Sequence, residues 1–476
     1  MIQFVAITPR VDPPPVSRHT TSDGHLRHTA LRSRAVREVA ELRVLIATVP
    51  LTGHVRPMLI VARALVARGH EVMWYGAAKF AAEIVAVGAT FAPMRAAPDW
   101  DDAEVESALP ALRGKRGIAR VKVQLRDMFI APMVEQLRDL EALVDEFIPD
   151  VVLADQAHLG AALVAEKRGL AWAGLGISAL VIPSIDTAPF GAARPPAKNP
   201  GDRTVYRFLN WLINRVLFRA VNRAYWRGRI AAGLPAGTTT YFDVLSPDLF
   251  LQPTIPSFEY PRSDLPSQLR FIGPLIARGT HAELPAWWPE VVAARDRGMA
   301  VVLVTQGTLA VDARELIGPA LRGLADMPVL VVATTTAQPQ QIGLAAWPSN
   351  ARVAPYVPYH ALLPRVAVMV TNGGYGGVQT ALGCGVPLVV AGGSEEKPEI
   401  AARVAWSGVG INLRTGHPRP VKVRRAVERI LREPMFTARA RSLADECARY
   451  DAEAAAAAAI EELVARRSRS PQTDAA

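Results

Sequence analysis

His54 and Asp155 have the side chains best suited to acid–base chemistry in the first half of this 476-residue chain. His54 lies in the predicted loop 50–57, after the buried-strand pattern 42–49, and Asp155 directly follows the strand pattern 151–154. Open α/β sheets bind ligands at the carboxyl ends of their strands, so both side chains are expected at one sheet edge. A neutral imidazole there can take a proton from a hydroxyl, while a carboxylate fixes its tautomer and stabilises the imidazolium.

A glycine-rich turn in the second half predicts an anion-binding site. The apolar run 366–370 stops at Thr371 and Asn372, passes four glycines and enters a helical pattern that ends at Gly385. Such glycines let backbone N–H groups approach an anion, and the start of a helix adds the positive end of its dipole. Taken alone, the turn fits either a diphosphate site or an ordinary connection between strand and helix.

Alternating strand and helix patterns predict an α/β fold with parallel, doubly wound sheets. Buried-strand patterns at 42–49, 71–75 and 150–154 are separated by helical patterns, and the alternation resumes at 299–308 after the proline-rich segment 253–289. A chain of this length exceeds what one core normally supports. We therefore expect two Rossmann-like domains.

Composition excludes several classes of protein. The net charge of +10 comes largely from arginines at the termini and in one internal segment, so no nucleic-acid partner is expected. Two cysteines exclude a disulfide framework and suit a reducing cytosol. No apolar run approaches the roughly 20 residues of a membrane span, and residues 1–40 lack the apolar stretch of a secretory signal. These features predict a cytoplasmic protein.

The internal basic segment, residues 203–229, carries arginines at four-residue spacing and no acidic residue. On a helix it would form a basic amphipathic surface. Such a surface fits either peripheral contact with an anionic membrane or a lid over an apolar cleft. The alternative is a domain helix that buries its apolar side and keeps its arginines in water.

The glycine turn and its surroundings resemble the donor-binding half of glycosyltransferase family 1, the UDP-sugar enzymes with the GT-B fold. The resemblance implies two Rossmann-like, doubly wound domains that face each other across a cleft. The family's box runs from an aromatic-x-Pro-Gln element through His-Gly-Gly-x-Gly-Thr/Ser-x-x-Glu and Gly-Val-Pro to a closing Asp-Gln. This chain has Tyr356-Val-Pro-Tyr359, the stretch 372–380, Gly385-Val-Pro387 and Glu396-Lys397 at those places. The spacing from the turn to the closing pair has no gap.

The resemblance implies a role for each matching position. Tyr356 would stack on the nucleobase, the Val357 backbone would hydrogen-bond its edge, the turn would hold the diphosphate, and the closing pair would meet the sugar hydroxyls. The donor-binding residues implied in this way are Tyr356, Val357, Asn372, Gly373, Gly374, Tyr375, Gly376, Gly377, Thr380, Glu396 and Lys397. Thr308, after another strand pattern, either gives its hydroxyl and N–H to the same diphosphate or belongs to a plain turn.

Several of these positions differ from the family's box. Asn372 stands in place of His. Gly377 stands in place of a residue with a hydroxyl group, so this position offers only its backbone N–H. Thr380 replaces the Glu that grips the ribose, with Gln379 as a substitute, and Lys397 replaces Gln and adds a cation. The donor base and sugar therefore stay open.

The same resemblance implies the chemistry. Family members carry a base His in Gly-His-x-x-Pro-like loops, matched by Gly53-His-Val-Arg-Pro57, and a partner Asp after a later strand, matched by Asp155. It implies an inverting transferase that needs neither a metal nor a cofactor, with His54 activating the acceptor. We expect it to move a hexose from a UDP- or dTDP-sugar to a hydroxyl of a hydrophobic small molecule or lipid.

These roles give the predicted boundaries their names. Residues 1–40 are a disordered N-terminal extension, 41–255 the acceptor-binding Rossmann-like domain, 256–290 the interdomain linker, 291–436 the nucleotide-sugar-binding Rossmann-like domain, and 437–476 a single C-terminal helix with a tail.

Other interpretations remain at this point. The fold also serves nucleotide-sugar epimerases or hydrolases, and a non-catalytic auxiliary protein would tolerate the altered donor box. Asp99-Trp-Asp101 spells a metal–nucleotide motif, but it follows no strand pattern, so we predict a solvated loop and no metal site. His70, at a junction of helix and strand, predicts a structural hydrogen bond.

Overall fold

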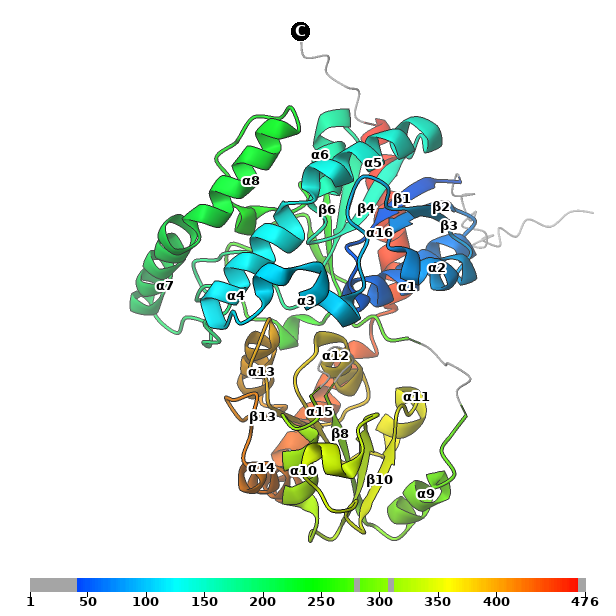
Figure 1. The fold of residues 1–476 in the computed structure, drawn as a ribbon, viewed down its shortest axis with the longest axis vertical. Helices are drawn as coiled ribbons and strands as arrows, with labels where there is room; N and C mark the ends of the chain where they lie inside the picture. The colour runs from blue at the N-terminus through cyan, green and yellow to red at the C-terminus, as the bar shows by residue number, and fades with distance from the viewer. Residues whose placement is uncertain (1–40, 278–282, 307–311, 470–476) are drawn as a thin grey trace, which may run out of the picture. The chain divides into compact units, whose positions relative to one another are not determined.

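A computed structural model describes residues 41–277, 283–306 and 312–469. The predicted extension 1–40 and the predicted site residue Thr308 lie outside the described residues. Within them, two parallel sheets of seven and six strands are each covered by helices (Figure 1). This arrangement confirms the α/β class and the two Rossmann-like sheets expected from the sequence.

The first sheet has the order β3-β2-β1-β4-β5-β6-β7, and its neighbouring strands run parallel. Its strands are β1 (Arg43–Ala47), β2 (Glu71–Gly76), β3 (Thr90–Pro93), β4 (Val151–Asp155), β5 (Ala171–Leu175), β6 (Leu249–Gln252) and β7 (Leu269–Phe271). The strand order reverses between β1 and β4, which makes their carboxyl ends the topological switch point where such sheets bind ligands.

The second sheet has the order β10-β9-β8-β11-β12-β13 and is also parallel. Its strands are β8 (Ala300–Thr305), β9 (Val329–Thr334), β10 (Ala351–Ala354), β11 (Val368–Thr371), β12 (Leu388–Val390) and β13 (Gly410–Asn412). Here the order reverses between β8 and β11. The glycine turn follows β11, so it stands at the switch point of this sheet.

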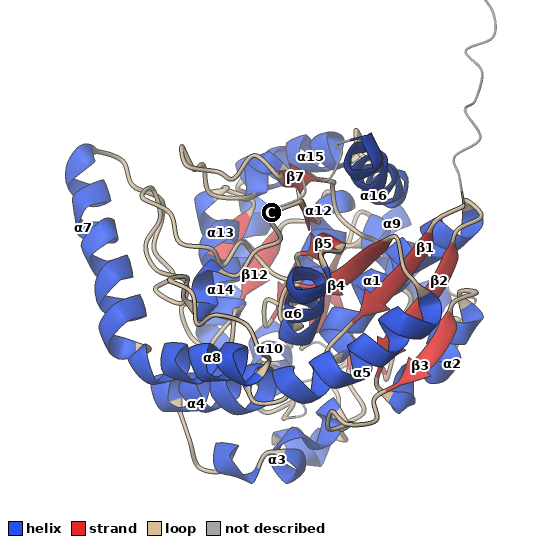
Figure 2. Ribbon diagram, turned by 90° about the horizontal axis from the view of Figure 1, so that it is seen from above, coloured by secondary structure: helices blue, strands red, loops and turns tan. Residues whose placement is uncertain are grey.

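Helices pack on both faces of each sheet, which is why the strands are almost continuously apolar. In the first part of the chain they are α1 (Thr52–Ala67), α2 (Ala81–Ala86), α3 (Val105–Ala108), α4 (Gly117–Val123), α5 (Met133–Phe147), α6 (Leu159–Arg168), α7 (Pro200–Leu212) and α8 (Arg219–Ala231). Later come α9 (Trp288–Asp296), α10 (Ile317–Leu324), α11 (Tyr359–Leu362), α12 (Tyr375–Gly383), α13 (Lys397–Trp406), α14 (Pro420–Arg432), α15 (Pro434–Cys447) and α16 (Ala452–Arg469). Figure 2 shows helices on either side of the strands.

Two predicted boundaries differ from the structure. The strand β7 belongs to the first sheet although it lies inside the predicted linker 256–290. The predicted single C-terminal helix is two helices, because the chain turns at 448–451. The Asp451 carboxylate then accepts the Ala454 N–H and caps the start of the second helix. The second of them, α16, packs its alanines into the core of the first sheet (Figure 1).

Within the described ranges, none of the helices combines the length and the apolar character that crossing a bilayer requires.

Candidate active site

The carboxylate of Asp155 and the imidazole of His54 are hydrogen-bonded at the first switch point. Asp155 Oδ1 lies 3.0 Å from His54 Nδ1, and both side chains are buried, with 1% and 9% of their surface exposed. The two Asp155 oxygens also accept the N–H groups of Val49 and Ala157, each at 2.8 Å. The carboxylate is thus fixed at the ends of β1 and β4 and orients the ring, so that His54 Nε2 is left to exchange a proton.

The environment keeps Asp155 ionised. Burial acts to raise its pKa, but the neighbouring His54 and His158 and the Val49 amide outweigh burial and hold the pKa below its ordinary value. An ionised Asp155 accepts the Nδ1–H of His54 and would stabilise the imidazolium after proton transfer. The arrangement therefore suits a general base.

The start of α1 differs from the predicted loop 50–57. The helix begins at Thr52, so His54 lies in its first turn. The Thr52 N–H donates to Asp102 Oδ2 at 2.7 Å, and Lys79 pairs with Asp102. This cap is about 50 residues away in sequence, and local pattern could not show that the helix would start so early.

The Asp99-Trp-Asp101 segment, for which we predict no metal site, makes structural contacts. Asp99 accepts the Ala78 N–H at 2.9 Å, and Asp101 pairs with Lys79 at 2.8 Å. In the part of the chain that the structure describes, no group of three His, Cys, Asp or Glu side chains has the arrangement of a metal site. His70 likewise makes the structural bonds expected of it, to the Leu42 amide at 3.3 Å and to Glu461 at 2.9 Å.

Phe129 flanks the catalytic candidate, and sequence analysis missed it. Its ring is stacked on the His54 imidazole, with centroids 6.3 Å apart and planes 25° apart. It comes from a π-helical turn, Gln124–Ile130, and such turns are frequent at functional sites. No sequence signal marks a π-turn, because its pattern is that of an ordinary amphipathic helix.

A second histidine lies beneath the pair. His158 is 1% exposed, and its Nδ1 accepts the Ala161 N–H at 3.2 Å, which caps α6. Burial lowers the pKa of His158 to about 4, although the charge of Asp155 acts in the opposite direction. The ring is therefore neutral at physiological pH and serves as a cap.

We expect this buried histidine to make stability depend on pH. Between about pH 4 and 6.5 the unfolded chain binds a proton at His158 and the folded chain does not, so folding is favoured as pH rises through this window. On acidification from pH 7 to pH 5, this residue should lower the free energy of unfolding by about 2 kcal/mol. His158→Asn keeps a capping oxygen without the titration, and urea unfolding of both proteins at the two pH values measures the difference. Equal losses in both would contradict this account.

The glycine turn is held by its own backbone and by Asn372. Gly373 has φ +89°, and an added Cβ would come within 2.8 Å of the Val390 side chain, so only glycine fits. Asn372 Nδ2 donates to the Gln306 carbonyl and Oδ1 accepts the Gly374 N–H at 3.4 Å. Asn372 thus links the end of β11 to the residue that follows β8, across the switch point of the second sheet.

The turn leads directly into α12, whose first residues are Tyr375, Gly376 and Gly377. The N–H groups of a first turn have no intrahelical carbonyl to bind, and they carry the positive end of the helix dipole. The side chain of Thr380, by contrast, donates to the Gly376 carbonyl at 2.8 Å. The backbone at the start of α12 is therefore the part of this turn best suited to bind an anion.

The suggestion that Gln379 replaces the missing ribose-binding Glu is not supported by its position. Gln379 is 2% exposed, and its amide exchanges hydrogen bonds of 2.8 and 3.1 Å with Thr254. The preceding tyrosine, Tyr375, is also buried and accepts a bond of 2.9 Å from Gln252. These bonds attach α12 to the last residue of β6 and to the segment after it.

A cavity of about 150 Å³ lies beside the turn. Asn372, Lys397 and Gln306 line it, so the structure brings together two predicted donor-binding residues that are 25 positions apart. Gln306 was missed from the sequence, although it ends a strand pattern at the same sheet edge. Tyr356 and Thr380 do not line this cavity; the Tyr356 side chain is 54% exposed, and Val357 is fully buried.

Glu396 and Lys397 form the start of α13. Lys397 pairs with Glu395, which has a left-handed backbone with φ +57°. Burial and the Glu395 charge raise the pKa of Glu396, while Lys397 and His54 act to lower it.

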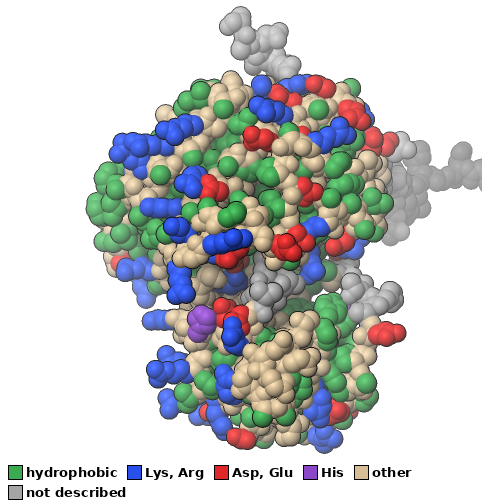
Figure 3. All heavy atoms as spheres, viewed as in Figure 1, with side chains coloured by type: hydrophobic (Ala, Val, Ile, Leu, Met, Phe, Trp, Pro, Cys, Tyr) green, Lys and Arg blue, Asp and Glu red, His purple; other side chains and the backbone are tan. Residues whose placement is uncertain are grey.

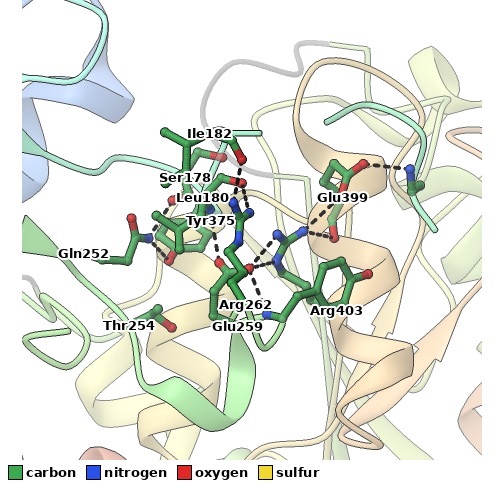
Figure 4. Close-up of polar contacts among 12 residues, drawn as sticks. Ser178, Leu180, Ile182, Gln252, Thr254, Glu259, Arg262, Tyr375, Glu399 and Arg403 are labelled. Atoms are coloured by element: carbon green, nitrogen blue, oxygen red, sulfur yellow. Dashed lines mark hydrogen bonds and ion pairs between the residues drawn. The ribbon is translucent and has the colours of Figure 1, made fainter. Parts of the chain in front are cut away.

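A buried ion network anchors α13 (Figure 4). Arg403, 1% exposed, donates to Glu259 at 2.6 Å and to Glu399 at 3.0 Å. Glu399 also accepts the N–H groups of Gly191 and Ala193 at 2.8 and 2.7 Å. The network therefore joins α13 to segments that follow β5 and β6 of the first sheet.

Comparison with known proteins identifies the family. The family described as "Erythromycin biosynthesis protein CIII-like, C-terminal domain" matches residues 320–463 of this chain. The chain is 45% identical over 425 residues to 4'-demethylrebeccamycin synthase of Lentzea aerocolonigenes, covering 89% of this chain and 99% of that one. The chain belongs to glycosyltransferase family 1. It is 34% identical to UDP-glycosyltransferase 2 of Phaeomoniella chlamydospora, over 90% of this chain and 97% of that one.

Solved structures of glycosyltransferases share the fold. The glycotransferase of kitacinnamycin matches 89% of this chain and 99% of its own, with a TM-score of 0.69 and 24% identity. VinC, solved in complex with DTDP, matches 89% of this chain and 100% of its own, with a TM-score of 0.64 and 21% identity. These matches confirm the GT-B fold, and the relatives above confirm that the chain is a glycosyltransferase that uses a nucleotide-sugar donor. They do not favour an epimerase, a hydrolase or a non-catalytic protein.

Proposed function

We propose that this enzyme is an inverting transferase in which His54 is the general base and Asp155 its partner. The observation that carries the proposal is the buried hydrogen bond between the two side chains at the switch point of the first sheet. His54 Nε2 takes the proton of the acceptor hydroxyl as its oxygen attacks the anomeric carbon. The bond from that carbon to the diphosphate oxygen breaks, and the nucleoside diphosphate leaves.

The proposed donor site is the second switch point. The start of α12 and Lys397 would carry the charge of the leaving diphosphate, which is the work that a metal ion does in other transferases. Asn372 would hold the turn in shape, Glu396 would meet the sugar hydroxyls, and Tyr356 with the Val357 backbone would meet the base. We propose no resident cofactor, because acid–base groups and backbone amides suffice for this displacement.

The proposed substrates follow the names of the relatives. The relatives include 4'-demethylrebeccamycin synthase and a UDP-glucosyltransferase. We therefore propose a hexose donor with a uridine or thymidine base and a hydrophobic acceptor that bears a hydroxyl. We place the enzyme in the cytoplasm, and we include peripheral membrane contact through residues 203–229, which would present lipid-soluble acceptors to it.

The direct test is a transfer assay with UDP-glucose and dTDP-glucose against a panel of phenols, polyketide aglycones and sterols. Mass spectrometry detects the product, and proton NMR of its anomeric coupling gives the stereochemistry. A β-glucoside formed from the α-linked donor supports inversion. Retention of the α-configuration, or release of free sugar alone, would contradict the mechanism.

A further inference from the structure

We infer that α7 and the π-helical turn after it, Ile213–Leu217, form a surface that lies on an anionic lipid bilayer. We define the α7 surface by its exposed apolar residues Val205, Phe208, Trp211 and Val216 together with the exposed Arg207 and Arg215. The exposed arginines 219, 223 and 227 follow on α8. The inference rests on the membrane contact in the proposed function and names the residues that make it.

Large apolar side chains point to water along this stretch. Phe208 and Trp211 are 58% and 56% exposed, and Val205 and Val216 are 49% and 55% exposed. The two aromatic rings stack on each other with centroids 6.0 Å apart. An amphipathic domain helix would bury such residues, and Tyr206 is the buried residue of α7. Contiguous exposed apolar residues of this kind mark interaction sites.

The helix is held so that this side stays outward. Asn210 donates to the carbonyls of Ser184 and Thr187 at 3.1 Å, and Arg203 pairs with Asp186 at 2.6 Å. These bonds fix the opposite side of α7 to the loop after β5. Figure 2 shows α7 at the edge of the fold, away from the strands. The surface is therefore formed before any partner arrives.

The charge of the α7 surface selects an acidic partner. No Asp or Glu occurs from 203 to 242. Arg203 and Arg229 pair with Asp186 and Glu166, whereas none of the described carboxylates forms an ion pair with the other five arginines. Figure 3 shows hydrophobic and basic side chains side by side where α7 lies.

A bilayer can contact both the apolar and the basic side chains of the α7 surface. Aromatic rings prefer the boundary between headgroups and acyl chains, and arginines reach anionic headgroups from the same depth. Each arginine near an anionic surface strengthens binding by about fivefold. A nucleic acid would leave the valines and stacked rings in water, so the lipid surface fits better.

The test is flotation of the full-length protein with vesicles of phosphatidylcholine alone and with added phosphatidylglycerol, at low and high salt. We expect binding to the anionic vesicles that falls about tenfold or more at high salt. The double variant Phe208→Ser and Trp211→Ser should lower binding about tenfold or more, and so should Arg207→Gln with Arg215→Gln. Val85→Ser is the matched control, because Val85 is 59% exposed on another helix of the same domain.

Equal binding to both vesicle types, binding unchanged in the variants, or no binding would overturn the inference, as would a shift in DNA mobility with no vesicle binding. Transfer to a water-soluble acceptor is measured on the same preparations. Normal transfer without vesicle binding would overturn the membrane contact and support the transferase activity. Vesicle binding without transfer would support the membrane contact and contradict the proposed transferase activity.

Discussion

His54→Ala is expected to lower kcat for sugar transfer by about 100- to 10,000-fold, because a positioned general base contributes a factor of this size. Donor binding should be retained, since the proposed nucleotide contacts come from the second sheet and α13. The measurement is steady-state transfer together with calorimetric binding of the nucleoside diphosphate. Loss of the Asp155 carboxylate should likewise lower kcat and retain donor binding, because this carboxylate orients the His54 ring through the hydrogen bond of 3.0 Å.

A matched control separates loss of the base from loss of a buried ring. His70 is another buried histidine, but it stands at the amino end of β2, on the opposite edge of the sheet. His70→Ala should lower Tm, because it breaks the bonds to Leu42 and Glu461, and leave kcat within about twofold. If His54→Ala and His70→Ala lower kcat equally, His54 is not the base.

Arg403→Ala should lower the free energy of unfolding by about 3 to 5 kcal/mol, because it leaves the buried carboxylates of Glu259 and Glu399 without their cation. Urea unfolding measures the loss. The variant should also weaken nucleotide-sugar binding, since Lys397 and Glu399 both lie in the first turn of α13.

Arg424→Ala is the comparison for this loss. Arg424 also pairs with a glutamate one turn away, but the Arg424 and Glu428 side chains are 40% and 44% exposed. Exposed pairs contribute little, so we expect a change of about 0.5 kcal/mol or less. Similar losses for Arg403 and Arg424 would show that the buried network does not hold the fold.

The sequence predicts strands and chemistry well where both are local. The apolar runs before Asn372 and Asp155 locate two strand ends, and parallel pairing then places those residues at sheet edges. Together with the matching spacing of the donor box, this gives the fold and most of the candidate site.

What escapes the sequence depends on contacts between distant residues. The early start of α1 needs Asp102, and the burial of Gln379 needs Thr254 from another domain's strand end. The outward aromatic side of α7 is also a tertiary effect, because the periodicity of Phe208 and Trp211 alone is that of a buried helix. Packing, which sequence pattern does not encode, decides each case.

The central claim is that a nucleoside diphosphate binds at the glycine turn, and calorimetry tests it most directly. UDP, dTDP, GDP and ADP are titrated into the wild type, Asn372→Ala and the control Asn412→Ala. Asn412 is the last residue of β13 in the same sheet, and its side chain accepts the Arg414 N–H at 2.7 Å. We expect selective binding of UDP or dTDP, weakened about 10- to 100-fold in Asn372→Ala and unchanged in Asn412→Ala. Absence of binding by all four, or equal affinity in the Asn372 variant, would contradict a donor site at this turn.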